Sequence, residues 1–151
     1  KLDRWLTDLG GQAAHIESEI SGFVYYSRYF TGPQRPETRG PVLTEIGTIS
    51  VLTLPGDNST WSVTVFAASA DTALRGLREA KRFTAVVGAC PLQAHWLAAE
   101  PITDVVVMAG ILDRYRRYVV DGCPVSTGVV AVGDAWACTN PSATRTCLEP
   151  Q

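Results

Sequence analysis

Residues 47–69 constrain the possible folds more than any other part of the sequence. Two runs typical of β-strands flank a turn cluster, Pro-Gly-Asp-Asn, at positions 55–58. The second run alternates apolar and polar residues in the order Trp61, Ser62, Val63, Thr64 and Val65. A period of two is typical of a strand with one packed face and one face turned to water or a ligand. The segment therefore predicts an antiparallel hairpin that contributes one face to a core.

Three helices are predicted from the spacing of apolar residues. The first covers residues 2–9, where Gly10-Gly11 provides a C-terminal stop. The second follows the hairpin, with Ser69 or Asp71 as its cap, and ends near Gly88. The stretch LQAHWLAAEP predicts a short third helix.

Further strands are predicted at residues 22–30 and in three later runs, TDVVVMAGI, DRYRRYVV and TGVVAV. Asp121-Gly122 predicts a tight turn between the last two runs. Strands and helices do not alternate regularly along the chain, which disfavours a purely parallel sheet. The expected fold class is α+β, with a mostly antiparallel sheet and flanking helices.

Composition excludes several classes of protein. The formal net charge of −2 gives no electrostatic footprint for nucleic acid. No apolar run approaches the roughly 18 residues that cross a bilayer as a helix, so no membrane span is expected. The four cysteines form no C-x-x-C pair and fit no zinc-ribbon spacing, so no metal site is expected. Reduced thiols in a cytoplasmic protein are the favoured interpretation.

Aromatic residues on the predicted strands are candidates for a substrate pocket. Tyr25, Tyr29 and Trp61, with Tyr26 beside them, would line a pocket for an organic small molecule. The alternative is that most of these rings fill the core, because strands favour aromatic residues in any case. Alternation puts Tyr25 and Tyr29 on one face of their strand and Tyr26 on the other.

Three arginines lie close together in the run DRYRRYVV. Alternation puts Arg114 and Arg116 on one face of the strand, and Arg117 with Tyr115 on the other. An anion site is one interpretation. A solvated face with ordinary ion pairs is the favoured one.

The apolar run Val129 to Val132 leads directly into Gly133-Asp134. Glycine lets the backbone approach a ligand closely, and aspartate accepts hydrogen bonds from hydroxyl groups such as those of a sugar chain. The carboxyl end of a buried strand is where open α/β sheets bind ligands. The alternative is a turn that ends the strand, with the aspartate as a local cap. The residues alone leave both interpretations open.

The segment VVAVGDAWACTNPSA resembles the second flavin-binding motif of FAD-dependent oxidoreductases with the p-hydroxybenzoate hydroxylase fold. That group comprises aromatic-ring monooxygenases, tryptophan halogenases and geranylgeranyl reductases. The resemblance implies that Asp134 contacts the ribityl chain of FAD and that Gly133 is the close-approach residue. It also implies that Ala135 belongs to the cofactor-binding Gly-Asp-Ala motif and that Pro141 lies near the isoalloxazine ring.

The resemblance implies three parts of the chain. Residues 1–15 would be a helix that follows a part of the FAD-binding domain not contained in this sequence. Residues 16–120 would be a sheet domain that covers an organic substrate over the flavin. Residues 121–151 would return to a strand of the FAD-binding domain and end in a truncated flavin loop.

Two departures from the family pattern concern the pyrophosphate of FAD. The sequence contains no Gly-rich βαβ unit, and Thr144-Arg145-Thr146 stands where the family has Gly-x-Gly. Threonine has a Cβ where glycine lets backbone and phosphate meet. We therefore expect this chain alone to bind FAD weakly or not at all.

Two functional hypotheses follow. In the first, the chain is a fragment of a monooxygenase-like FAD-dependent oxidoreductase that acts on an organic small molecule. No catalytic dyad is then expected, because the cofactor carries the chemistry. In the alternative, the chain is a non-catalytic remnant, or a sheet domain that binds a small molecule or a partner without flavin. Apolar surface left exposed would favour self-association.

Overall fold

The structure, a computed structural model, describes residues 2–139 and divides them into two compact units. The terminal unit contains the residues up to Ser21 and from Ile111 onward, and the insert unit contains residues 22–110. The sequence prediction instead places its boundaries after residues 15 and 120. The difference arises because strand β1 (His15–Ile20) pairs along its whole length with strand β8 (Leu112–Arg117), which keeps both strands in the terminal unit.

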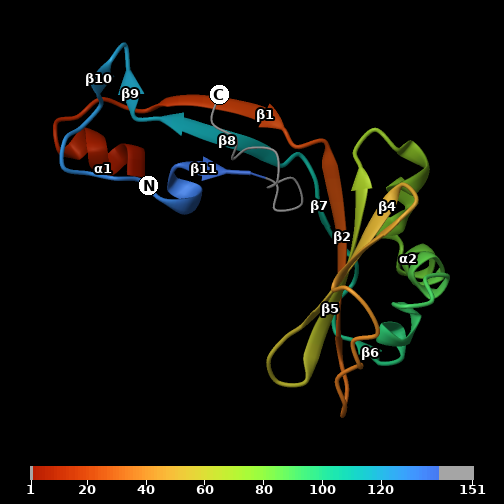
Figure 1. The fold of residues 1–151 in the computed structure, drawn as a ribbon. Helices are drawn as coiled ribbons and strands as arrows, with labels where there is room; N and C mark the ends of the chain where they lie inside the picture. Colours follow the sequence, from red (N-terminus) through yellow and green to blue (C-terminus); the bar gives the residue numbers. More distant parts are fainter. Residues whose placement is uncertain (1, 140–151) are drawn as a thin grey trace. The chain divides into compact units, whose positions relative to one another are not determined.

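The terminal unit is built on a three-stranded antiparallel sheet in the order β1-β8-β11, where β11 is Ala137–Cys138. Helix α1 (Leu2–Asp8) precedes this sheet, as the apolar spacing predicts. The unit also contains a small hairpin and a 3-10 turn, namely β9 (Val119–Val120), β10 (Cys123–Pro124) and η3 (Gly133–Ala135). Figure 1 shows β8 between β1 and β11.

The insert unit contains an antiparallel sheet in the order β3-β4-β5-β2-β6, with β7 also paired to β2. Three helical segments follow β5 along the chain. The elements are β2 (Phe23–Thr31), β3 (Leu43–Ile46), β4 (Ile49–Pro55), β5 (Thr60–Ala68), η1 (Thr72–Arg78), α2 (Ala80–Gly88), η2 (Ala94–Leu97), β6 (Glu100–Pro101) and β7 (Val106–Met108). The predicted α+β class with mostly antiparallel sheets is confirmed.

The hairpin predicted at residues 47–69 is present as β4 and β5. Its register runs from Ile49 opposite Ala67 to Pro55 opposite Trp61. The turn bends through two residues with positive φ, Asn58 at 53° and Ser59 at 55°. The alternating apolar residues of β5 are buried as predicted.

The core of the insert unit lies between one face of its sheet and the helical segments (Figure 1). Phe83 and Val87 of α2 are fully buried there. The strands contribute the residues of one alternating face, which are Tyr26, Phe30, Val51, Trp61, Val63, Val65 and Ala67.

The helix predicted after the hairpin is divided in two. Asp71 caps η1 by accepting a hydrogen bond from the backbone N–H of Ala73 at 3.0 Å. Glu79 then takes an extended conformation, with ψ of 126°, before α2 begins. The short third helix is present as η2.

The predicted strand TGVVAV is not a strand in the structure. Val130 is 84% exposed and Val132 is 74% exposed, so the run is also not buried. The reason is that no strand within residues 2–139 pairs with it. The Asp121-Gly122 turn does form, with φ of 51° and 75°, but it joins β9 to β10.

Phe83→Ala is expected to lower the free energy of unfolding by about 3–5 kcal/mol, because it opens a cavity at a fully buried ring. Phe23, which is 36% exposed in the same unit, provides the control. Phe23→Ala is expected to lower the free energy of unfolding much less. Urea unfolding of both variants measures the difference, and equal costs would contradict the assignment of Phe83 to the core.

Candidate functional site

The Gly-Asp-Ala segment forms the single 3-10 turn η3 at the surface of the terminal unit. Gly133 has φ of +58°, a left-handed conformation that glycine adopts without strain. Within the described residues, a Cβ added at Gly133 would meet no atom within 4 Å. The backbone angle, and not a close protein contact, is therefore what requires glycine here.

Four consecutive carbonyl groups of this turn accept hydrogen bonds. The backbone N–H of Trp136 donates to the carbonyl of Gly133 at 2.9 Å, and the backbone N–H of Arg116 donates to the carbonyl of Trp136 at 2.9 Å. Between them, Arg116 Nη1 donates to the carbonyl of Asp134 at 3.0 Å. The hydroxyl of Tyr118 donates to the carbonyl of Ala135 at 2.6 Å. The backbone of the turn is thus fixed by the strand beside it.

The backbone carbonyl of Asp134 is hydrogen-bonded, but its side chain is exposed and makes no hydrogen bond or ion pair within residues 2–139. A free carboxylate can accept several hydrogen bonds from hydroxyl groups. The local-cap interpretation does not apply, because no backbone N–H donates to this carboxylate within those residues. Pro141, the other expected cofactor contact, lies outside the described residues.

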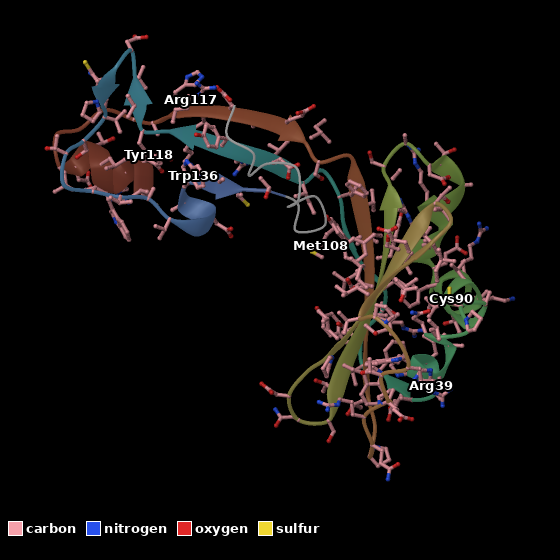
Figure 2. All side chains as sticks on the ribbon, in the orientation of Figure 1. Arg39, Cys90, Met108, Arg117, Tyr118 and Trp136 are labelled. Atoms are coloured by element: carbon pink, nitrogen blue, oxygen red, sulfur yellow. The ribbon has the colours of Figure 1, made fainter. Side chains whose placement is uncertain are left out.

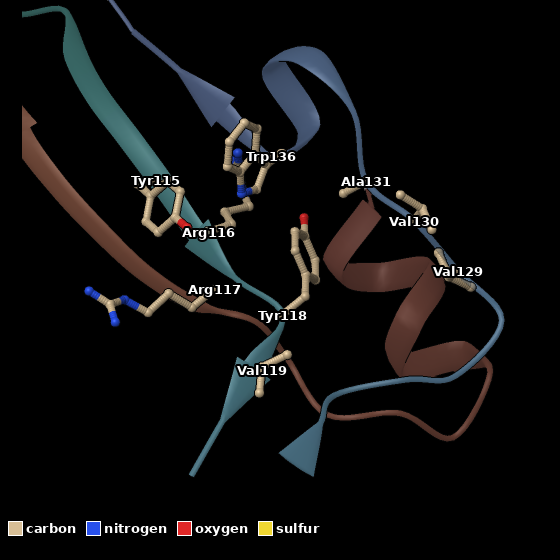
Figure 3. A pocket seen from close by; sticks show the side chains of 9 residues that line it. All are labelled: Tyr115, Arg116, Arg117, Tyr118, Val119, Val129, Val130, Ala131 and Trp136. Atoms are coloured by element: carbon tan, nitrogen blue, oxygen red, sulfur yellow. The ribbon is translucent and has the colours of Figure 1, made fainter. Parts of the chain in front are cut away.

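A pocket of about 440 Å³ lies beside the turn (Figure 3). On one side the ring of Tyr115 meets the ring of Trp136 edge to face, with 5.6 Å between centroids. On another side lies the exposed apolar run from Val129 to Ala131. Figure 3 shows the side chain of Tyr118 between β8 and this run. The lining of the pocket is therefore mostly apolar and aromatic, and its charged residues are Arg116 and Arg117.

Two of the three arginines of the DRYRRYVV run, Arg116 and Arg117, form ordinary ion pairs, and Arg116 also holds the turn. Arg117 Nε lies 2.7 Å from the carboxylate of Glu17 on β1. Arg116 Nε lies 3.8 Å from the carboxylate of Asp3 on α1. The favoured interpretation, a face with ion pairs, describes both residues. The bonds from Arg116 and Tyr118 to the turn carry no sequence signal, because donors reach backbone groups only after the chain has folded.

The expected aromatic pocket of the insert unit is divided between the two faces of its sheet. Tyr25 and Tyr29 point to the face opposite the core, which we call the open face. Trp61 lies on the core face, 2% exposed, and its Nε1 donates to the carbonyl of Trp96 at 2.9 Å. Trp61 therefore does not line a site with the two tyrosines. The reason is the register, which places Trp61 opposite Phe30, one residue beyond Tyr29.

The open face has a polar centre within an apolar border. Ser27 and Thr64 share a hydrogen bond of 2.8 Å between their hydroxyl groups, and both are buried. The rings of Tyr25 and Phe66 pack edge to face beside them, with 4.6 Å between centroids. Met108 is opposite Tyr25 in the register and is 47% exposed. Figure 2 shows Met108 on the opposite side of this sheet from Cys90, which belongs to the core.

Other kinds of site find no support within residues 2–139. No group of three or more His, Cys, Asp or Glu residues there could hold a metal ion. Cys90 is buried, and burial raises the pKa of its thiol. In the same part of the chain, no helix has both the length and the apolar character needed to span a membrane.

Comparison with known proteins adds no relative. No protein-family model matches the sequence, and no curated protein matches it at a significant level.

The hydroxyl of Tyr118 makes the stability of the terminal unit depend on pH. Burial raises the pKa of this hydroxyl above its ordinary value near 10, the carboxylate of Asp3 raises it further, and the guanidinium of Arg116 lowers it. The unfolded chain releases this proton at a lower pH than the folded chain. The contribution of the protonated hydroxyl to the free energy of unfolding is therefore complete below the ordinary pKa. It is lost as the pH rises through the raised pKa.

The free energy of unfolding is therefore expected to decrease as the pH rises above about 10, and to decrease less in Tyr118→Phe. Urea unfolding at a series of pH values measures the slope. Tyr115→Phe, three residues earlier in the chain, is the control and should keep the slope of the original protein. Equal slopes in all three proteins would contradict this role for Tyr118.

Proposed function

We propose that this chain is part of an FAD-dependent oxidoreductase of the monooxygenase-like group, and that Asp134 binds the ribityl chain of the flavin. The observation that carries the proposal is the exposed carboxylate of Asp134, which has no partner within residues 2–139, on a turn whose four carbonyl groups all accept hydrogen bonds. The ribityl chain is a row of hydroxyl groups, which are the donors that such a carboxylate accepts. The FAD would supply the redox chemistry when bound.

The exposed run Val129 to Val132 supports the same proposal. Four apolar residues that lead into a ligand-binding turn, with up to 84% exposure, are energetically unfavourable in water. Pairing with further strands would bury them. We propose that a Gly-rich βαβ segment supplies those strands, together with the donors for the FAD pyrophosphate.

The open face of the insert unit is the proposed substrate side. Its aromatic and aliphatic side chains, including Tyr25 and Tyr29, suit an apolar ring. The side chains proposed to meet the ring are the exposed Tyr29 and Met108, because Tyr25, Ser27 and Thr64 are buried beside them. In this assignment the protein binds and orients an organic small molecule.

The protein encoded by the complete reading frame that contains this chain provides the test. We expect it to include a Gly-rich βαβ segment and to carry flavin after purification. Asp134→Ala is expected to weaken flavin binding by about 1.5–3 kcal/mol, which is roughly 10- to 100-fold, because a charged acceptor is lost. A flavin titration that follows fluorescence quenching measures the dissociation constant.

Asp104 is the matched control, because it is an exposed aspartate in the insert unit and no described contact involves its carboxylate. Asp104→Ala should bind flavin as the original protein does. A colourless full-length protein that does not respond to added FAD would refute the proposal. Equal flavin affinity in Asp134→Ala and Asp104→Ala would refute the role of Asp134.

A second candidate function, binding of a small aromatic molecule without flavin, rests on the open face alone. Met108 is the only methionine of the chain, so labelling its methyl group gives one NMR signal from this face. If the second candidate is right, small phenols and aromatic acids should shift this signal in the 151-residue chain. An unchanged signal across such a series, in a folded sample, would remove this candidate.

A further inference from the structure

We infer that Arg116 and Tyr118 are positioning residues, which hold the turn of residues 133–136 so that the carboxylate of Asp134 faces outward. The hydrogen bonds to the turn are properties of the structure. The ligand that the carboxylate meets, the ribityl chain, rests on the proposed function. Neither residue belongs to the motif that resembles flavin-binding proteins.

The turn needs such support because it is too short to be stable alone. A single helical turn fixes several backbone angles for very few hydrogen bonds of its own, which is unfavourable. Here the bond from the Trp136 N–H to the Gly133 carbonyl closes the turn, and Gly133 adds the flexibility of glycine. Without further donors, water would compete for the carbonyls of Asp134 and Ala135.

The side chains of Arg116 and Tyr118 supply those donors from a neighbouring segment of the chain. Arg116 lies in β8, which ends at Arg117, and Tyr118 is the first residue after the strand. Both side chains reach the same turn, as their hydrogen bonds to it show. Their donors reach two consecutive carbonyls, at 3.0 Å and 2.6 Å. The bonds to the turn hold the backbone on both sides of Asp134, and the side chain of Asp134 is left unpaired within the described residues. The arrangement fixes the backbone and leaves the carboxylate available.

Asp3 holds Arg116 in place from the other side. Its carboxylate lies 3.8 Å from Arg116 Nε, and the Arg116 side chain is only 17% exposed. The planar guanidinium uses one edge for the carboxylate and another nitrogen for the turn, which lysine could not reproduce. Helix α1, strand β8 and the turn are thereby connected through one side chain.

Amide hydrogen exchange of the 151-residue chain tests the positioning directly. Tyr118→Phe removes only the hydroxyl, so we expect the amides of Trp136 and Arg116, which close the turn, to exchange roughly two- to tenfold faster. The amide of Val125 donates to the backbone carbonyl of Tyr118 and should keep its rate. Amides of the insert unit report any general loss of stability.

Tyr115→Phe is the matched control, because Tyr115 lies in β8 three residues before Tyr118 and its hydroxyl has no described hydrogen bond to the turn. It should leave the Trp136 amide unchanged. Arg116→Lys is a second test and should also speed exchange of that amide, which covers the case that Tyr118→Phe folds poorly. Unchanged exchange at Trp136 in both variants, or an equal increase at every amide, would overturn the inference.

A double-mutant cycle on the flavin-loaded, full-length protein separates the inference from the proposed function. We expect Tyr118→Phe to weaken flavin binding roughly two- to tenfold when Asp134 is present, and to have no further effect in the Asp134→Ala background. If Asp134→Ala weakens binding and Tyr118→Phe does not, the positioning role is wrong and the flavin site stands. If Tyr118→Phe loosens the turn and Asp134→Ala leaves flavin affinity unchanged, the proposed function is wrong.

Discussion

The antiparallel pairing of β1 with β8 is the interaction on which the rest of the structure depends. Six residue pairs, from His15–Arg117 to Ile20–Leu112, join residues that lie 92 to 102 positions apart in the sequence. Because these strands lie side by side, residues 22–110 leave and return at neighbouring points and form a unit of their own. The same pairing makes β8 the central strand of its sheet, with β11 on its other edge.

That central position explains the chemistry of the turn. β8 and the residue that follows it bring Arg116 and Tyr118 to the carbonyls of residues 134 and 135, and β11 fixes the chain just after them. The backbone conformation of the turn depends on two separate features. Gly133 permits the positive φ, and Arg116 and Tyr118 donate hydrogen bonds to the carbonyls that follow it. Because the backbone of this aspartate is already held, little backbone conformational entropy would be lost if its carboxylate bound a ligand.

The sequence was sufficient for the elements whose pattern is local. The alternation from Trp61 to Val65 predicted both the hairpin and its packed face, and the spacing from Leu2 to Leu9 predicted α1. It was not sufficient where the structure of a segment depends on a neighbouring strand. The run Val129–Val132 has the composition of a buried strand, yet burial requires a neighbouring strand that residues 2–139 do not contain.

The candidate site shows the same limit. Gly133 and Asp134 were recognisable from their residue types, whereas Arg116 and Tyr118 act on backbone carbonyls and follow no motif. Tyr29 and Trp61 were grouped because both are aromatic, but the cross-strand register puts them on opposite faces. The register of β2 with β5 is a non-local property, because no turn joins these two strands directly and their pairing follows from the packing of the folded sheet.

The central claim is that the carboxylate of Asp134 binds the ribityl chain of a flavin. Its most direct test compares the affinities of the full-length protein for riboflavin and for lumiflavin, which has the same ring system without the ribityl chain. The account expects riboflavin to bind more tightly, and this preference to disappear in Asp134→Ala. Equal affinity for the two compounds, or a preference that Asp134→Ala leaves unchanged, would contradict it.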